Sequence, residues 1–253
     1  MYILASDYDG TLSRGGISPE DRKAVEEFRK AGNLFGIVTG RDYWMYQTVQ
    51  EAGFSLDFIL AMNGAMLVAT DGPRTGEILS CEEKPNDGCI RWIARHVGEK
   101  YGYGVDTVLI RDRISFHGAK PEGDGEHYKP LAFADTIPAF SQMNTRCRTS
   151  EDARRCVEEI NRAWGGTVNA LQNGVCIDIP PAGIDKGEGV ARYAAKMGVG
   201  EDKVYCAGDN MNDYAMIARF HGLAVEDAVP ELKAAAERSF PSVGKMIEYI
   251  MGK

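Results

Sequence analysis

The sequence lacks a long apolar run, a cysteine-rich motif and an excess of positive charge. No stretch reaches the roughly 18 consecutive apolar residues that a membrane span needs. The start, Met1-Tyr-Ile-Leu-Ala-Ser-Asp, has no basic segment of the kind that opens a signal peptide. The six cysteines are scattered, and none forms a Cys-x-x-Cys pair. This pattern argues against a zinc site and favours free thiols in a reducing compartment, so we expect a cytoplasmic protein.

Acidic residues outnumber basic ones, 37 to 29, which gives a formal net charge of -8. Because an acidic surface repels phosphate backbones, we expect no nucleic-acid partner. Because no apolar run is long enough for a membrane span, we also expect no membrane partner. A small phosphorylated molecule can still bind where cations gather locally. With 253 residues, 44% of them hydrophobic, the chain is long enough to form a core without disulfides.

Short apolar runs alternate with helical patterns at both ends of the chain. The first block has strand-like runs at 2–6, 34–39 and 58–62, with helical patterns at 19–31 and 42–52. The second block has a helix at 186–197, a strand at 203–207, a helix at 212–219, a strand at 222–225, and helices at 230–238 and 243–251. This alternation predicts an α/β fold, a doubly wound, Rossmann-like parallel sheet with helices on both faces.

The middle of the chain has a different order of predicted helices and strands. Its expected elements are a helix at 87–100, strands at 105–110, 114–116 and 139–146, a helix at 150–164, and strands at 167–171 and 175–179. Two helix-plus-strands units in succession are typical of an α+β domain. We therefore predict a core made of residues 1–83 and 182–253, with an inserted α+β domain at 84–181.

Two aspartates alternate in Asp7-Tyr8-Asp9-Gly10-Thr11, at the end of the first predicted strand. In extended chain residues i and i+2 share a face, so both carboxylates can point into one site. Two such close carboxylates resist ionisation unless a cation lies between them, and oxygen ligands suit Mg²⁺. The alternative is a turn in which these residues serve backbone geometry only.

Three further stretches contain candidate binding or catalytic residues. Thr39 and Gly40 end a strand, where a hydroxyl and a backbone N–H can bind a phosphoryl oxygen or simply start a helix. Lys186 begins a predicted helix, where its charge opposes the helix dipole; it either neutralises an anion or is a solvated surface lysine. Residues 208–213, Gly-Asp-Asn-Met-Asn-Asp, form either a polar site or an Asx-rich turn.

The four stretches occur in a fixed order, and together they resemble the haloacid dehalogenase (HAD) superfamily of phosphohydrolases. The superfamily pattern is DxDGT, a Ser/Thr strand end, a distant Lys, and GDxxND. Met62-Asn63-Gly64-Ala65 and residues 222–233 resemble the Cof-type branch with a type IIB cap. In that branch the cap is inserted after the third strand and a hairpin, as residues 84–181 are here.

The resemblance implies a role for each motif residue. Asp7 is the nucleophile that forms an aspartyl-phosphate, and Asp9 is the general acid and base. The cofactor is Mg²⁺, held by the Asp7 and Asp209 carboxylates and the backbone carbonyl of Asp9, while Asp213 orients a metal-bound water. The groups that bind the phosphoryl oxygens are the Tyr8 amide, Thr39, the Gly40 amide, Lys186 and Asn212.

The implied function is a Mg²⁺-dependent phosphatase acting on a small phosphorylated metabolite, and the leading substrate candidate is a sugar phosphate. A phosphoglycolate phosphatase and a phosphomutase of the same superfamily are the alternatives. A phospho-aspartate signalling receiver also combines clustered aspartates with a Thr and a Lys. Receivers are short single domains that need no second aspartate two residues after the first, so this hypothesis is the most distant.

Substrate contacts outside the motifs are harder to predict. Asn63 ends the third strand and is one candidate. Arg41 is either a second candidate or the partner in a structural ion pair. The inserted domain offers Arg111, Arg113, His117, His127, Lys129, Arg146 and Arg148, and its cap role would make it the domain that selects the substrate.

Overall fold

The computed structural model describes residues 1–70, 72–109, 112–116 and 128–252. The chain divides into two compact units. Unit 1 comprises Met1–Ser80 and Asp185–Lys253, and unit 2 comprises Cys81–Ile184. Within the described ranges, every helix is too short or too polar to traverse a lipid bilayer.

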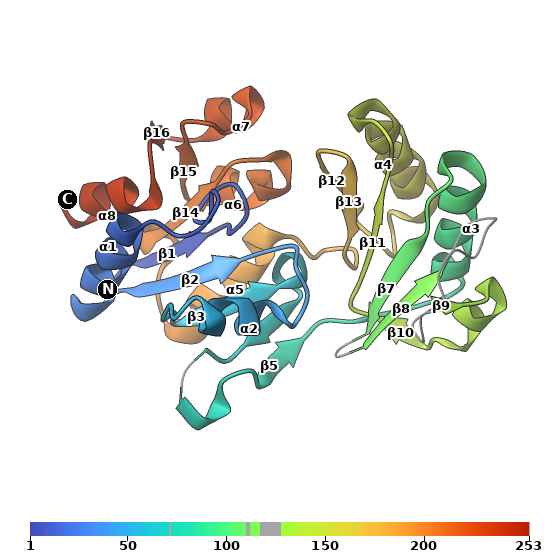
Figure 1. Ribbon diagram of the computed structural model, residues 1–253, viewed down its shortest axis with the longest axis horizontal. Coiled ribbons are helices and arrows are strands. Elements are labelled where there is room, and N and C mark those ends of the chain that lie inside the picture. Colours follow the sequence, from blue (N-terminus) through green and yellow to red (C-terminus); the bar gives the residue numbers. More distant parts are fainter. Residues whose placement is uncertain (71, 110–111, 117–127, 253) are drawn as a thin grey trace. The chain divides into compact units, whose positions relative to one another are not determined.

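Unit 1 is built on an eight-stranded sheet in the order β16-β15-β14-β1-β2-β3-β4-β5 (Figure 1). The strands are β1 Ile3–Ser6, β2 Leu34–Val38, β3 Phe58–Ala61, β4 Met66–Val68, β5 Ile78–Cys81, β14 Val204–Gly208, β15 His221–Val225 and β16 Arg238–Phe240. The strands from β16 to β3 run parallel, and β4 is antiparallel to β3. This mostly parallel sheet confirms the predicted doubly wound α/β fold.

In the part of unit 1 that the structure describes, six α-helices accompany the sheet. They are α1 Pro19–Lys30, α2 Met45–Glu51, α5 Lys186–Met197, α6 Tyr214–Arg219, α7 Pro230–Ala235 and α8 Val243–Met251. The β1–α1–β2 and β14–α6–β15 connections step in opposite directions across the sheet. Since such crossovers are right-handed, α1 and α6 cover opposite faces. The Ser18 hydroxyl accepts the Asp21 N–H at 3.0 Å and caps α1, because Ser before Pro19 is a strong start signal.

One helix of unit 1 is shorter than its sequence pattern predicts. The pattern favours a helix over 230–238, but α7 ends at Ala235, and Arg238–Phe240 forms the edge strand β16. The backbone of Ala236 is extended, and Phe240 pairs with Val225 in the parallel ladder to β15. Pairing with a distant strand therefore overrides the local helical preference.

Unit 2 combines a six-stranded sheet, in the order β12-β13-β11-β7-β8-β9, with helices α3 Cys89–Tyr101 and α4 Ser150–Trp164. The strands are β7 Val105–Leu109, β8 Asp112–Phe116, β9 Tyr128–Lys129, β11 Gln142–Arg146, β12 Leu171–Asn173 and β13 Cys176–Ile179. A separate ladder joins β6 Lys84–Pro85 to β10 Ala139–Phe140. Side chains from one face of the sheet are buried in one hydrophobic core with residues of α3 and α4, among them Val105, Phe116, Met143 and Ile177.

The strand predicted at 167–171 is wrong over most of its length. The strand of this region is β12, Leu171–Asn173. The amides of Thr167 and Val168 instead donate to the Trp164 carbonyl, at 2.7 and 2.9 Å, and so close the end of α4. The Val168 side chain packs in the hydrophobic core of unit 2, so its apolar character reflects core packing beyond the helix end and not a strand.

Candidate active site

Asp7 directly follows β1, and its carboxylate lies in the interior of unit 1 with Lys186. The Lys186 ammonium donates to Asp7 Oδ1 at 2.6 Å and to Asp213 Oδ1 at 2.5 Å. The Lys186 side chain is fully buried and that of Asp213 is also fully buried. The alternative of a solvated surface lysine is therefore wrong for Lys186.

Helix α5 brings Lys186 into the interior because it packs very closely on the turn after β3. The Asp185 carboxylate caps α5 by accepting the Glu188 N–H at 2.8 Å. A Cβ added at Gly189 would lie only 2.6 Å from the Cα of Gly64. Gly189, the second glycine of the Lys186-Gly-Glu-Gly segment, thus permits this close approach.

Asp209, after β14, is held by the loop that follows β1. The Thr11 hydroxyl donates to Asp209 Oδ1 at 2.8 Å. Gly10 has a φ of +86°, and a Cβ there would lie 2.6 Å from Asp209 Oδ2, so the position requires glycine. The sequence motif indicates no separate role for Thr11, and the structure shows that its hydroxyl fixes the Asp209 carboxylate.

Asp213 joins the same cluster from the short turn Met211–Asp213. Its Oδ2 accepts the N–H groups of Asp209 and Asn210 at 3.0 and 3.2 Å. Carboxylate oxygens of Asp7, Asp209 and Asp213 all lie within 4.8 Å of one another. The structure thus brings three predicted carboxylates around a single ammonium group.

Burial controls the electrostatics of this cluster. It raises the pKa of Asp7 well above its usual range, against the lowering effect of the Lys186 charge. Burial and the nearby Asp213 charge also raise the pKa of Asp209. The pKa of Lys186 is raised, because the charges of Asp213 and Asp7 outweigh the cost of its own burial. Negative charge is therefore in excess at this point of the molecule.

Asp9 lies apart from the buried cluster and pairs with Arg41. The Arg41 guanidinium donates through Nε and Nη2 to the two carboxylate oxygens of Asp9, both at 2.7 Å. The two side chains are about half exposed. Arg41 therefore forms an ion pair, the second of the two predicted alternatives. Its partner in that ion pair is Asp9, the predicted general acid.

The remaining predicted residues of unit 1 lie in the loops around this cluster. Thr39 is buried, and its Oγ1 accepts the Arg41 N–H at 3.1 Å. Asn63 is fully buried with a left-handed φ of 52°, and its N–H donates to the Thr39 carbonyl. Asn212 and Tyr8 are also largely buried, while Gly40 is partly exposed. The phosphate or substrate roles of these residues stay predictions.

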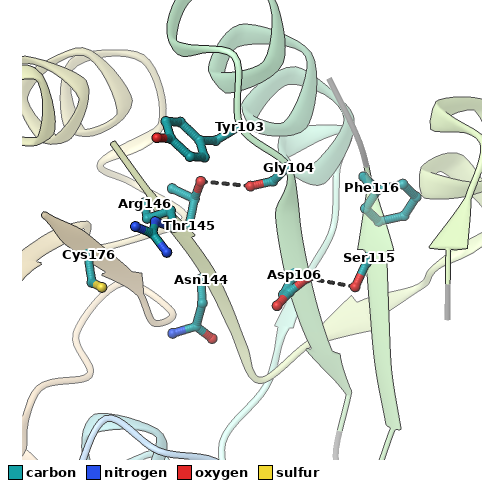
Figure 2. A pocket seen from close by; sticks show the side chains of 9 residues that line it. All are labelled: Tyr103, Gly104, Asp106, Ser115, Phe116, Asn144, Thr145, Arg146 and Cys176. Atoms are coloured by element: carbon teal, nitrogen blue, oxygen red, sulfur yellow. Dashed lines mark hydrogen bonds between the residues drawn. The ribbon is translucent and has the colours of Figure 1, made fainter. Parts of the chain in front are cut away.

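Unit 2 carries a pocket of its own, with a volume of about 280 Å³. Its lining residues, shown in Figure 2, are Tyr103, Gly104, Asp106, Ser115, Phe116, Asn144, Thr145, Arg146 and Cys176. The strand register places Asn144 opposite Asp106, and Asp106 opposite Ser115, on the sheet face away from α3 and α4. The Ser115 hydroxyl donates to Asp106 Oδ1 at 2.6 Å, and the Asn144 amide donates to Asp178 Oδ1 at 2.7 Å.

Among the candidates predicted in the insert, Arg146 lines this pocket, and its guanidinium lies over the Tyr103 ring at 5.7 Å. Arg148 borders a different hollow of unit 2 together with Arg155 and Glu159. Lys129 is exposed, over the Phe133 ring. Arg111, His117 and His127 lie outside the described residues, as does the side chain of Arg113.

A mostly parallel sheet with an acidic cluster and a buried lysine beyond its strand ends is the arrangement expected of HAD phosphohydrolases. Residues 4–245 match the family of haloacid dehalogenase-like hydrolases. The chain belongs to this family.

Relatives and solved structures agree with this assignment. HMP-PP phosphatase of Serratia proteamaculans is 23% identical over 249 residues, covering 92% of this chain and 87% of that protein. Phosphoglycolate phosphatase of Pyrobaculum aerophilum is 34% identical over 180 residues, covering 64% of this chain and 78% of that protein. A HAD subclass IIB sugar phosphatase shares the fold with a TM-score of 0.80, at 19% identity and 99% coverage of both chains. The predicted class, a phosphoric monoester hydrolase of HAD, Cof type, is confirmed.

Proposed function

We propose that the protein is a Mg²⁺-dependent phosphatase that hydrolyses a small phosphorylated metabolite through an aspartyl-phosphate on Asp7. The leading substrate candidate is a sugar phosphate. The observation that carries this proposal is the convergence of the Asp7, Asp209 and Asp213 carboxylates, two of which, Asp7 and Asp213, pair with the buried Lys186 ammonium. A buried carboxylate beside a fixed cation is suited to attack an electrophile that brings negative charge of its own.

The donor set fits a magnesium ion. Three carboxylates lie within 4.8 Å of one another with one ammonium between two of them, so a divalent cation would offset the excess negative charge. Asp7 and Asp209 would hold the ion with the backbone carbonyl of Asp9, and Asp213 would orient its bound water. When bound, Mg²⁺ supplies electrostatic stabilisation of the phosphoryl oxygens.

In the first half of the reaction, a carboxylate oxygen of Asp7 attacks the phosphorus atom. A new O–P bond forms on Asp7 as the ester O–P bond breaks, and Asp9 gives its proton to the departing alcohol. In the second half, Asp9 takes a proton from water. The water oxygen attacks the phosphorus, the Asp7 O–P bond breaks, and inorganic phosphate leaves.

The neighbouring loops bind the transferring group. Thr39 and Asn212 offer side-chain donors, Lys186 offers its ammonium, and the amides of Gly40 and Tyr8 complete the set. This set of donors supports phosphate binding by a chain of net charge -8.

We assign substrate selection to unit 2, as the cap resemblance of residues 84–181 suggests. Its pocket presents an acceptor in Asp106, a donor and acceptor in Asn144, and a donor in Arg146. Such a set is suited to vicinal hydroxyl groups, which supports a sugar phosphate. Phosphoglycolate is the second candidate, because the relative at 34% identity is a phosphoglycolate phosphatase.

Release of inorganic phosphate from a panel of esters tests this function. Purified protein with Mg²⁺ should hydrolyse sugar phosphates faster than 2-phosphoglycolate, and EDTA should stop both reactions. Formation of an isomeric phosphate ester without phosphate release would indicate a phosphomutase. A phosphorylated Asp7 that persists for minutes would indicate a signalling receiver.

A further inference from the structure

The ion pair between Arg41 and Asp9 joins the two loops that carry the proposed chemistry. Asp9 lies two residues after Asp7, and Arg41 lies two residues after Thr39. Both oxygens of Asp9 accept from Arg41 at 2.7 Å, in the forked geometry that a guanidinium and a carboxylate share. Two parallel hydrogen bonds fix the plane of the carboxylate as well as its position.

Arg41 is itself anchored in several ways, unlike an ordinary surface arginine. Its N–H donates to Thr39 Oγ1 at 3.1 Å, and its carbonyl accepts the Met62 N–H at 2.8 Å. Its guanidinium lies 5.3 Å from the centre of the Tyr8 ring, within the range of a cation–π contact. The orientation of Asp9 is therefore set by the loop after β2, and not by its own loop alone.

We infer that Arg41 is a positioning residue that holds the Asp9 carboxyl group for proton transfer to the leaving alcohol. This inference rests on the proposed function, in which Asp9 is the general acid. The Asp9 side chain is 54% exposed, so without a partner it would turn among several rotamers. While Asp9 carries the proton, one carboxyl oxygen still accepts from Arg41 and the other presents the proton.

The chemistry of the leaving group gives a specific readout for this role. An alkoxide is a poor leaving group and needs the proton from Asp9, whereas p-nitrophenolate departs without one. A misplaced general acid therefore slows alkyl esters more than aryl esters. A merely structural arginine would lower the rates of both esters by the same factor.

The experiment compares wild type, Arg41→Gln and Arg41→Lys with Mg²⁺, on a sugar phosphate and on p-nitrophenyl phosphate. Arg74→Gln is the matched control, because Arg74 makes the same forked pair with Glu77 on an exposed hairpin. We expect kcat/KM of Arg41→Gln to fall by about 10- to 100-fold on the sugar phosphate and several-fold less on the aryl ester. The kcat/KM of Arg41→Lys should lie between those of Arg41→Gln and wild type, and the kcat/KM of Arg74→Gln should match that of wild type.

Two further measurements complete the test. In an Asp9→Asn background, Arg41→Gln should add little further loss, because both changes disable one step. Thermal unfolding of Arg41→Gln should match that of Arg74→Gln. Equal loss on both esters, full additivity with Asp9→Asn, or unchanged or faster turnover would overturn the positioning role. A wild-type protein that releases phosphate from neither ester would instead refute the proposed function.

Discussion

Each unit of the molecule contains an ionic cluster, buried in unit 1 and partly exposed in unit 2, and the two clusters are balanced in opposite ways. In unit 1, the carboxylates of Asp7, Asp209 and Asp213 lie close together, and the Lys186 ammonium pairs with two of them, Asp7 and Asp213. Burial raises the pKa of Asp7 and of Asp209. In unit 2, the single carboxylate of Glu159 contacts His96 and Tyr101, each at 2.8 Å, and also Lys100.

The pKa of Glu159 shows the effect of having three hydrogen-bonding partners for one carboxylate. Burial by itself would raise it, but the hydrogen bonds from Lys100, His96 and Tyr101 outweigh burial and lower the pKa to about 2. Glu159, with its three partners on α3, is therefore a structural link between α3 and α4. The unit 1 cluster has fewer cations than carboxylates, so it is suited to bind a further cation. Carboxylates with raised pKa values, such as Asp7 and Asp209, mark functional sites.

Replacing the nucleophile should give the largest effect on activity. Asp7→Asn keeps the shape of the side chain but removes its charge, so phosphate release should fall by more than about 10⁴-fold. Thermal stability should hold or rise, because one of three crowded carboxylates is gone. Asp202→Asn, on an exposed turn, is the control. Wild-type turnover in Asp7→Asn would refute the assignment.

Removing the ammonium should test how far the unit 1 cluster depends on it. Lys186→Met leaves the Asp7 and Asp213 carboxylates buried without their cation, at a cost of about 3–5 kcal/mol in the free energy of unfolding. Urea denaturation measures this loss. The matched change in unit 2, Lys100→Met, should cost much less, since the Lys100 side chain is 49% exposed. Equal losses would erase the contrast between the clusters.

Magnesium should stabilise unit 1 without any substrate present. At about 100 times its dissociation constant, a bound ion adds roughly 2.7 kcal/mol to the free energy of unfolding. We expect Mg²⁺ to raise the Tm of wild type, and to raise that of Asp209→Asn far less. Identical shifts in both proteins would show that the ion binds elsewhere.

The smallest effect concerns pH and the link in unit 2. A carboxyl group with a pKa of about 2 in the folded state and about 4.3 unfolded stabilises the fold above pH 4.3. This contribution is lost as the pH falls through that interval. Glu159→Gln should therefore lower stability at pH 7 by about 1–3 kcal/mol, and the difference from wild type should vanish near pH 2. A constant difference across this range would contradict the assignment.

Local signals in the sequence were enough to predict most of the fold and the main acidic cluster. Ser18 before Pro19 marks the start of α1, and paired carboxylates at a strand end mark Asp7. Lys186 stood out because a cation at a helix start is locally unfavourable, and its burial against Asp7 gives the physical reason.

Features that depend on distant partners were not predictable in the same way. The Arg41–Asp9 fork, the Thr11–Asp209 bond and the Glu159 cluster each join residues that no local pattern relates. Strand β16 was missed for the same reason, since its ladder partner lies on β15. Long-range pairing decides such features, and a single sequence carries no record of it.

Chemical trapping of the covalent intermediate tests the central claim most directly. Acid quenching during turnover, followed by borohydride reduction, converts an aspartyl-phosphate into homoserine, which peptide mass spectrometry locates. The account predicts homoserine at position 7 in wild type with substrate and Mg²⁺, and none without substrate. Homoserine at Asp9, Asp209 or Asp213, or turnover that never yields it at position 7, would contradict the account.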